Sequence, residues 1–338
     1  MSRPRVAWYV HHHGRGHVGR LLAIAPHLDT DILCFSSLPR PDGLPENCEW
    51  VHLERDDAVE PGAPPAERDP SAGGLLHWAP LLHDGHRRRL TAIAATIDRR
   101  AVAAFVVDVS AEVTLFARLL GIPPVLITQP GQRDDDTHLL AFRAAAAIIA
   151  PWPEELLRPR HLGAFPQVAY VGGISRFDGR TAPSDHRSGV LVLSGAGGTT
   201  VTAEALDAAV AATHGQSWSS VGPLGGGVWS ADPWEQLGRA DVVVAWAGQN
   251  SVADLAAAGS RAVIIPQGRP FGEQDATADA LEHAGLAVVE RGWPTADRWH
   301  DVLGRARALR PEWSRWRTSG AAARAARAIE DVANTRWP

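Results

Sequence analysis

The chain has 338 residues, of which 45% are hydrophobic, and a formal net charge of -5 at pH 7. This length exceeds the size at which one hydrophobic core keeps growing, so it predicts two domains, and the acidic balance offers no electrostatic reason to expect nucleic acid as a partner. Two cysteines, Cys34 and Cys48, are too few for a disulfide scaffold or a four-cysteine zinc site, and they fit a cytoplasmic protein.

The first half begins with a short apolar run at residues 6–10, a glycine-containing turn, and apolar residues at helical spacing from Leu21 to Leu28. This pattern indicates strand, glycine loop and helix. It predicts further strands at residues 31–35, 50–53, 103–107 and 124–128, a helix at 111–120, and a mobile surface loop at 62–74. Continuous apolar strands that alternate with helices indicate a parallel sheet covered on both faces.

The same pattern starts again at residue 189, with a strand at 190–193, a glycine loop at 195–200 and a helix at 203–212. Strands are predicted at 242–245, 262–266 and 287–289, and helices at 251–258 and 274–283. The sequence therefore predicts two Rossmann-like domains, over residues 1–172 and 189–312, joined by a linker rich in Gly, Pro and Ser at 173–188. An Ala- and Arg-rich helical tail over 313–338 is expected to pack on the first domain.

The loop after the first strand reads Gly14-Arg15-Gly16-His17. Its glycines permit close backbone approach to a ligand, and the following helix N-terminus favours negative charge. A nicotinamide cofactor is disfavoured, because the third glycine of the dinucleotide fingerprint is missing and Gly19 comes one residue early for it. We interpret His17 as a general base that faces a cleft; a capping or packing histidine is the alternative.

Asp108 ends a buried strand, at the edge where open parallel sheets gather the groups that bind ligands. If His17 lies across that edge, Asp108 can accept its second N–H and raise its basicity. The alternative is that Asp108 caps the helix that follows.

Three consecutive histidines, His11, His12 and His13, precede this loop. Consecutive residues that leave a strand point to alternate sides, so the three imidazoles are not expected to face one ion. We therefore expect no metal site.

Two strand-to-helix glycine turns in the second half are suited to phosphate oxygens, because their backbone N–H groups and helix dipoles favour anions. The first turn contains Gly197, Gly198 and Thr199, and the second contains Gly248, Gln249, Asn250 and Ser251. Asp254 follows one turn inside the second helix, and Glu273 and Gln274 start the next helix. This succession of groups suits a diphosphate, a ribose and a sugar.

Residues 241–280 resemble the donor-binding segment of GT-B glycosyltransferases, in particular the MurG-like family (glycosyltransferase family 28), which uses UDP-N-acetylglucosamine, and the wider UDP-glycosyltransferases. The Gly14–His17 loop is similar to the glycine-rich acceptor-side loop of that family. The resemblance covers both halves in order. It implies an α/β fold with two parallel-sheet domains facing across a cleft and a C-terminal helix that returns toward the N-terminal, acceptor-binding domain.

The resemblance also implies roles for single residues. Gly248 to Ser251 would contact the diphosphate, Asp254 the ribose, and Glu273 and Gln274 the donor sugar, while Val228 and Trp229 would hold the uracil. His17 and Asp108 match a catalytic dyad, and Gly14, Gly16 and Gln129 would lie on the acceptor side. Thr277 stands where the family often has Asn, and the family's usual His before the Glu-Gln pair is absent, which leaves the donor sugar open.

We therefore expect an inverting, metal-independent glycosyltransferase (EC 2.4 type) that needs no cofactor beyond a nucleotide-sugar co-substrate, with UDP favoured. The acceptor would be a hydroxyl-bearing small molecule or a lipid-linked molecule. One alternative is a nucleotide-sugar epimerase, in which Glu112 or residues 134–136 would supply the extra acids. Another is a non-catalytic nucleotide-sugar sensor, which needs no base at position 17.

Partners other than substrates are not encoded by any motif, and we expect a monomer or weak dimer. No window reaches the run of ~18 apolar residues that crosses a bilayer, and the first residues lack the apolar stretch of a signal peptide. Trp78, Leu81 and Leu82 lie beside three arginines at 87–89. A solvated helix face is the interpretation we favour, with peripheral membrane contact as the alternative.

Overall fold

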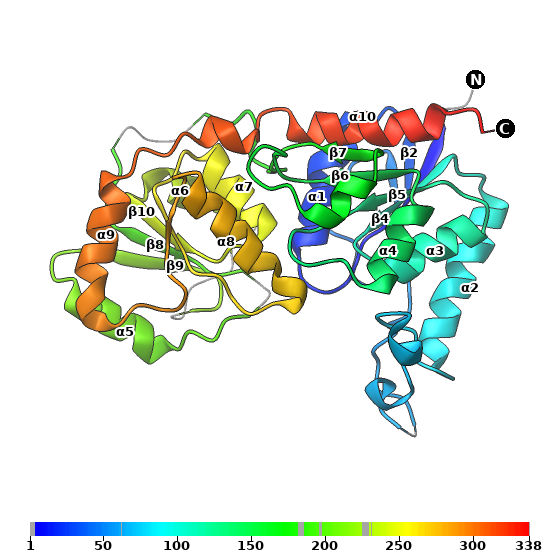
Figure 1. Ribbon diagram of the computed structural model, residues 1–338, viewed down its shortest axis with the longest axis horizontal. Coiled ribbons are helices and arrows are strands. Elements are labelled where there is room, and N and C mark those ends of the chain that lie inside the picture. The colour runs from blue at the N-terminus through cyan, green and yellow to red at the C-terminus, as the bar shows by residue number, and fades with distance from the viewer. Residues whose placement is uncertain are drawn as a thin grey trace.

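The computed structural model describes residues 4–61, 63–181, 186–195, 198–224, 230 and 232–337. Within these residues the strands form two sheets, of seven and five strands, in which every pairing is parallel (Figure 1). The first sheet contains β1 (Arg5–Tyr9), β2 (Asp31–Ser36), β3 (Cys48–His52), β4 (Ala104–Asp108), β5 (Pro124–Ile127), β6 (Ala147–Ala150) and β7 (Val168–Tyr170). The second contains β8 (Val190–Leu193), β9 (Trp218–Val221), β10 (Val242–Ala245), β11 (Ala262–Ile264) and β12 (Val288–Val289).

Helices connect most of these strands. In the first half they are α1 (Gly16–Ile24), α2 (Asp84–Arg99), α3 (Ala111–Leu119) and α4 (Asp136–Ala144). In the second half they are α5 (Ala203–Ala212), α6 (Trp234–Arg239), α7 (Gln249–Ala257), α8 (Glu273–His283) and α9 (Trp299–Ala308), and α10 (Ala321–Asn334) follows them. The α/β architecture predicted from the sequence is confirmed.

Strand β1 shows why the first sheet is covered on both faces. Val6, Trp8 and Val10 point into one core cluster with α1 and α10, whereas Ala7 and Tyr9 point into another with α2 and α3. All five side chains are at most 2% exposed. Alternate residues of a strand face opposite sides of the sheet, so an unbroken apolar strand requires two apolar layers.

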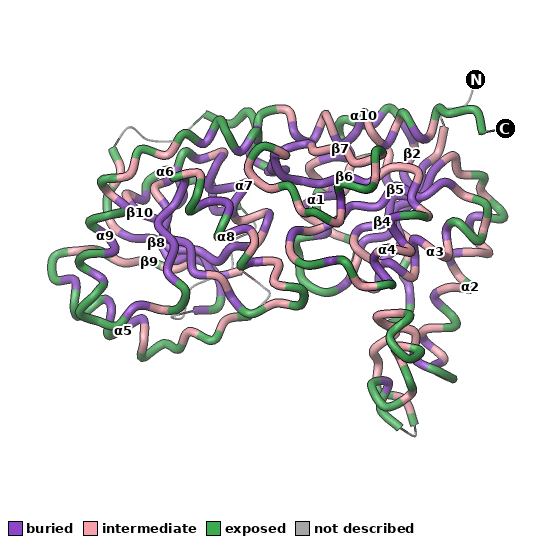
Figure 2. Tube along the Cα trace, viewed as in Figure 1, coloured by how far each residue is buried: buried purple, intermediate pink, exposed green. Residues whose placement is uncertain are grey.

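The second sheet has the same construction. Val190 and Val192 of β8 pack with α5 and α9, whereas Leu191 and Leu193 face the opposite layer, which contains α7 and α8. That second layer continues into the first half through Trp152 and neighbouring residues. Figure 2 shows the buried strands in the middle of each half, with exposed segments at the periphery.

Helix α10 lies along the first half, as the red ribbon of Figure 1 shows. Its buried residues follow helical spacing and join the core beside β1 and β4, and they are Ala321, Ala322, Ala325, Ala326, Ile329 and Val332. Such a stripe provides the apolar face that a helix needs to dock on a sheet. The C-terminal helix therefore returns to the N-terminal half, as expected.

Strand order determines where a ligand can bind. The first sheet runs β3-β2-β1-β4-β5-β6-β7 and the second runs β12-β11-β10-β8-β9. Successive strands are added toward one edge of the sheet and then toward the other, and this change of side falls between β1 and β4 in the first sheet and between β8 and β10 in the second. Open parallel sheets bind ligands beyond the carboxyl ends of such strand pairs. His17 follows β1 and Asp108 ends β4, so both belong to the first of these switch points.

Several elements were not predicted, among them α2, α4, α9 and strands β6, β7 and β9. Residues 62–74, predicted as a surface loop, contain short 3-10 turns at Pro65–Glu67 and Ala72–Gly74. They belong to a segment between β3 and α2 that extends away from the body of the protein (Figure 1).

Candidate active site

A cleft of about 260 Å³ lies between the two halves. The first half contributes the loop after β1 and the start of α1, and the second contributes residues that follow β8 and β10 and the first residues of α7 and α8. The predicted site residues that line it are Gly14, Gly16, His17, Gln129, Gly248, Gln249, Asn250, Ser251, Asp254, Glu273 and Gln274. Residues predicted from separate motifs therefore meet around one cavity.

The two predicted catalytic residues are in contact. Nδ1 of His17 lies 3.0 Å from Oδ1 of Asp108, and both side chains are buried. Because β1 and β4 are neighbours in the sheet, the residues that follow them meet at one edge. With Nδ1 directed to the carboxylate, Nε2 is the ring nitrogen that can accept a proton in the cleft.

The alternative that His17 or Asp108 caps a helix does not agree with the helix N-termini. The helix after Asp108 is capped by Ser110, whose hydroxyl accepts the backbone N–H of Val113 at 3.2 Å. At the start of α1 no side chain caps the helix. Neither His17 nor Asp108 therefore caps a helix, and their side chains contact each other.

Arg20 is a member of this cluster that the sequence analysis missed. It lies one turn after His17 on α1, is 3% exposed, and its Nη1 donates to Oδ1 of Asp108 at 2.5 Å. Its Nη2 donates to Oε1 of Gln249 in the other half at 3.1 Å. Arg20 thus connects the buried carboxylate to the helix α7 across the cleft.

The charge state of Asp108 follows from these contacts. Complete burial alone would raise the pKa of Asp108, but the guanidinium of Arg20 and the ring of His17 outweigh it and hold the pKa below its ordinary value. Asp108 is therefore an anion at neutral pH, which is the state that accepts a hydrogen bond from His17 and stabilises an imidazolium.

The backbone is strained beside this carboxylate. Val109 has a φ of 66°, a conformation that a β-branched residue rarely adopts. Its N–H donates to the carbonyl of Ile127 at 3.1 Å, which holds the turn between Asp108 and the Ser110 cap. Strain of this kind costs on the order of 1–3 kcal/mol and is found mostly at functional sites.

The residues predicted to hold the diphosphate begin α7. Gly248 is the N-cap of this helix and has no side chain to occupy the free backbone N–H groups. Asn250 instead crosses the cleft, where its Nδ2 donates to the carbonyl of Gly16 at 2.8 Å. A Cβ on Gly19 would lie 3.1 Å from the same amide nitrogen, so glycine allows this close approach of α1 and α7.

Asp254 lies deeper in the second half and is 5% exposed. The hydroxyl of Ser175 donates to its Oδ1 at 2.7 Å, and Nε of Arg176 lies 3.5 Å from its Oδ2. Burial raises the pKa of Asp254 to about 6, although Arg176 and Ser175 act in the opposite direction. A carboxylate with so few donors in the described structure has capacity for further donors, such as the hydroxyls of a ribose.

Glu273 and Gln274 start α8 and differ in their surroundings. Burial raises the pKa of Glu273, against the effect of Arg133, whose Nη2 lies 4.0 Å away. Oε1 of Gln274 accepts the backbone N–H groups of Ala247 at 3.2 Å and of Gln267 at 2.9 Å. Gln274 therefore fixes the two strand-end loops, and only its amide nitrogen remains for a ligand.

The first glycine turn of the second half is only partly described. Thr199 donates its hydroxyl to Oε1 of Gln267 at 3.2 Å, and the carbonyl of Gly198 accepts from Arg269 at 3.1 Å. Neither Gly198 nor Thr199 is among the described residues that line the cleft. The predicted residues Gly197, Val228 and Trp229 lie outside the described residues.

Some cleft residues carried no signal in a motif. Arg176 lies in the stretch interpreted as a linker and Arg269 lies in a loop, yet both line the cavity. Arg20 could have been found from its spacing, since residues three apart on a helix share a face with the catalytic candidate. For Arg176 and Arg269, single arginines in loops, we find no such signal.

The histidine triplet behaves differently from the prediction. Strand β1 ends at Tyr9, and His12 and His13 lie in a bend. The three side chains therefore do not alternate as those of strand residues do. The rings of His12 and His13 lie 4.4 Å apart, and both approach Asp57. The argument that these imidazoles face apart is therefore wrong for His12 and His13.

Two of the acids considered for an epimerase have structural contacts within the first half. Oε1 of Glu112 accepts the backbone N–H groups of His77 at 2.7 Å and Trp78 at 3.1 Å. Asp135 caps α4 and accepts the backbone N–H of His138 at 3.1 Å. None of these acids is among the described residues of the cleft.

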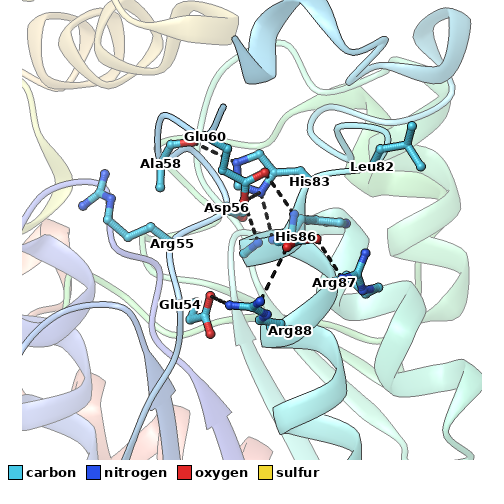
Figure 3. Close-up of polar contacts among 12 residues, drawn as sticks. Glu54, Arg55, Asp56, Ala58, Glu60, Leu82, His83, His86, Arg87 and Arg88 are labelled. Carbon is cyan, nitrogen blue, oxygen red and sulfur yellow. Dashed lines mark hydrogen bonds and ion pairs between the residues drawn. The ribbon is translucent and has the colours of Figure 1, made fainter. Parts of the chain in front are cut away.

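The apolar residues near α2 are in part exposed. Leu81 and Leu82 are 60% and 89% exposed, and Figure 3 shows Leu82 apart from the polar network. Arg87 and Arg88 are solvated, but Arg89 is buried against Asp56, so it does not belong to the solvated face predicted for it. Among the residues that the structure describes, no helix combines the length and apolar character needed to cross a bilayer.

Comparisons with known proteins agree with this geometry. Residues 231–291 match the glycosyltransferase family 28 C-terminal domain. The two-sheet architecture is the GT-B fold of the solved structures that it matches. No sequence among the curated proteins matches the chain.

Solved structures with this fold cover almost the whole chain. A UDP-glucosyltransferase from Polygonum tinctorium, crystallised with 3,4-dichloroaniline and capable of glucosylating indoxyl, has a TM-score of 0.69 at 17% identity over 99% of both chains. The calicheamicin glycosyltransferase CalG4 has a TM-score of 0.65 at 17% identity, over 99% of this chain and 100% of that chain. MurG of Acinetobacter baumannii has a TM-score of 0.61 at 17% identity, over 97% of this chain and 99% of that chain. The family match and the shared GT-B architecture support a glycosyltransferase.

Proposed function

We propose that this protein transfers a sugar from a UDP-linked donor to a hydroxyl group of an acceptor, with inversion at the anomeric carbon. The observation that carries this proposal is the contact between His17 and Asp108 on one wall of a cleft whose other wall contains Asp254 and Glu273. A base on one side and polar groups suited to a nucleotide-sugar on the other are the parts that direct displacement needs.

His17 would act as the general base. Asp108 holds the imidazole through Nδ1, so Nε2 can remove the proton of the acceptor hydroxyl as its oxygen attacks the anomeric carbon. The bond from that carbon to the donor phosphate then breaks, and the proton stays on the imidazolium, which the Asp108 anion stabilises. Attack from the face opposite the leaving group gives inversion.

The leaving diphosphate would be stabilised without a divalent metal. The N-terminus of α7 offers free backbone N–H groups after Gly248, and this end of a helix carries partial positive charge. Arg176 and Arg269 line the same cleft and add cationic character. Together these groups supply the electrostatic stabilisation for which other enzymes use a metal ion.

The donor would lie on the second half. Asp254 would accept the ribose hydroxyls and Glu273 hydroxyls of the sugar; in support, both are carboxylates that line the cavity. UDP is the nucleotide we propose because, among solved structures of the same fold, one is named a UDP-glucosyltransferase and another is a complex with UDP-2-fluoro-glucose. The acceptor would enter beside Gly14, Gly16 and Gln129 in the first half.

Two other functions fit less well. An epimerase would need acids around the sugar, but Glu112 binds the loop before α2, Asp135 caps α4, and neither lines the cleft in the described residues. A non-catalytic sensor would need no base, and it leaves the buried contact of His17 with Asp108 and the strained backbone at Val109 without a purpose.

A donor-and-acceptor screen by mass spectrometry tests the proposal. The wild-type protein is incubated with UDP-sugars and hydroxyl-bearing acceptors, and product configuration is determined by NMR. We expect a glycoside with inverted anomeric configuration that is absent with His17→Ala. Retention of configuration, or epimerised nucleotide-sugar in place of a glycoside, would contradict it.

A further inference from the structure

Three side chains converge at the edge of the cleft, outside the dyad. Nε2 of His12 lies 3.6 Å from Oδ2 of Asp57, and Nε2 of His13 lies 3.4 Å from the same oxygen. The three potential ligand atoms lie within 4.8 Å of one another. Zinc bonds of about 2.0–2.2 Å in a tetrahedron place neighbouring ligand atoms ~3.4 Å apart, so both spacings match those between two ligands of one ion, while the His13–Asp57 contact is also a long hydrogen bond.

His12 provides a second and independent observation. Its side chain is only 2% exposed, Nε2 lies 3.5 Å from Oδ1 of Asp56 as well as near Asp57, and neither ring nitrogen makes a hydrogen bond of good geometry to a described residue. A buried polar atom without a partner costs about 1–3 kcal/mol, and native structures rarely leave one without a reason. A cation bound to Nε2 would provide that nitrogen with a partner.

The segment that carries Asp57 is held firmly in place. Asp56 pairs with the buried Arg89 at 2.6 Å. Ala58 and Glu60, which follow Asp57, contact the start of α2 (Figure 3). Glu60 accepts the backbone N–H of Gly85 at 3.0 Å, and Nε2 of His83 contacts the carbonyl of Ala58 at 2.9 Å. Asp57 therefore reaches the histidines from a fixed support, as a metal ligand must.

Arg55 is the group that opposes a cation here. It binds Asp57 through Nε at 2.8 Å and through Nη2 at 2.6 Å, and the second contact uses the oxygen that faces the histidines. Arg55 is about half exposed, and in Figure 3 its side chain extends away from the network around His83. It can therefore yield Oδ2 to a metal ion and turn toward solvent, at a cost in affinity.

A similar cluster elsewhere lacks these features. His77 and His138 both contact Asp135, but Nδ1 of His138 lies 2.5 Å from that carboxylate and Nε2 lies 2.8 Å from Nη1 of Arg133. Both nitrogens of His138 are thus occupied. This cluster is a matched control for the first.

We propose that His12, His13 and Asp57 bind one divalent transition-metal cation, with zinc as the best match for two imidazoles and one carboxylate. His13 lines the cleft, so the cation would fix the turn before Gly14 at its acceptor edge. This site lies on the half opposite Asp254 and Glu273 and takes no part in stabilising the diphosphate. The proposal does not depend on the transfer reaction.

The test is a titration of untagged, metal-free protein with Co²⁺, followed by visible absorption, and with Zn²⁺ in competition. We expect one equivalent of Co²⁺ to give d–d bands that Zn²⁺ abolishes. His13→Ala and Asp57→Asn should each weaken binding by more than the roughly 10- to 100-fold typical of losing an outer-shell partner. Both variants change partly exposed side chains, and circular dichroism checks their folding.

Two further variants separate the proposal from adventitious binding. Arg55→Met should tighten Zn²⁺ binding, because it removes the competing guanidinium, whereas His77→Ala should leave the affinity unchanged. The proposal is overturned if the wild-type protein binds no stoichiometric metal, if His13→Ala and Asp57→Asn retain it, or if His77→Ala loses it.

Discussion

Arg20→Met tests the buried cluster that holds the dyad. Methionine keeps much of the length of the arginine stem but removes the guanidinium that donates to Asp108 at 2.5 Å and to Gln249 at 3.1 Å. Asp108 is completely buried, so the substitution leaves a buried carboxylate with His17 as its remaining partner. Removing one member of a buried ion pair costs about 3–5 kcal/mol, and we expect a loss of unfolding free energy of that order at pH 7.5.

The pH dependence of stability gives this prediction a sign. In the wild type the pKa of Asp108 is lowered, so its contribution to stability is present at neutral pH and is lost as the pH falls through that value. Removing Arg20 leaves only His17 to oppose the effect of burial, so we expect the pKa of Asp108 to rise and protonation at lower pH to restore stability. The deficit of Arg20→Met should therefore shrink between pH 7.5 and pH 5.

Urea unfolding followed by tryptophan fluorescence measures both effects. The matched control is Arg239→Met, which removes an exposed arginine paired with Glu235 and should cost less than ~1 kcal/mol. Adding Asp108→Asn to Arg20→Met should recover part of the loss, because the buried charge is gone. If Arg20→Met costs no more than Arg239→Met, or its deficit grows as the pH falls, the reasoning about the buried pair is refuted.

Three further predictions concern the donor side. Asp254→Ala should weaken UDP binding by ~1–3 kcal/mol in calorimetry, the value of a charge-assisted hydrogen bond, and an unchanged affinity in a folded variant would remove Asp254 from the site. Because burial raises the pKa of Asp254 to about 6 and ribose hydroxyls donate to its anion, UDP-glucose should bind more weakly as the pH falls from 7 to 5. Asp254→Asn should lose this pH dependence. If the variant keeps the pH dependence, another group causes it. Sugar transfer should continue in EDTA. The measurement is made with the wild type and with His13→Ala, so that an effect of the proposed zinc site is distinguished from a metal requirement of the reaction. Complete loss of transfer that magnesium or manganese restores would refute metal-independent transfer.

The sequence predicted the fold well where apolar runs are unambiguous. The strands at Val190–Leu193 and Val242–Ala245 and the helix at Ala203–Ala212 have the bounds that were expected. Elements with mixed composition were missed, such as β9, whose sequence Trp-Ser-Ser-Val offers little apolar pattern. Helix α2 was missed because its sequence begins with charged residues and has few large apolar residues, so the helical spacing of the buried Ile93 and Ile97 is not evident.

The candidate site was predicted to the extent that it follows from strand ends and glycine turns. His17 and Asp108 meet because β1 and β4 are parallel neighbours, so the residues that follow them lie at the same edge of the sheet. The position of each residue just after a predicted strand is enough to indicate this. The contact of Ser175 with Asp254 comes from within the stretch interpreted as a linker and depends on how that stretch packs against α7. Such contacts arise only in the folded chain, and no local pattern encodes them.

The most direct test of the account is the rate of sugar transfer by His17→Ala in a single turnover, with donor and acceptor identified by the screen. We expect a ~100- to 10,000-fold lower chemical rate with donor affinity near the wild-type value, since the base lies in the opposite half from the donor groups. Asp108→Asn should cost less and add little in the double variant, because the carboxylate acts only through the imidazole. Transfer by folded His17→Ala at the wild-type rate would contradict the assignment of His17 as the base.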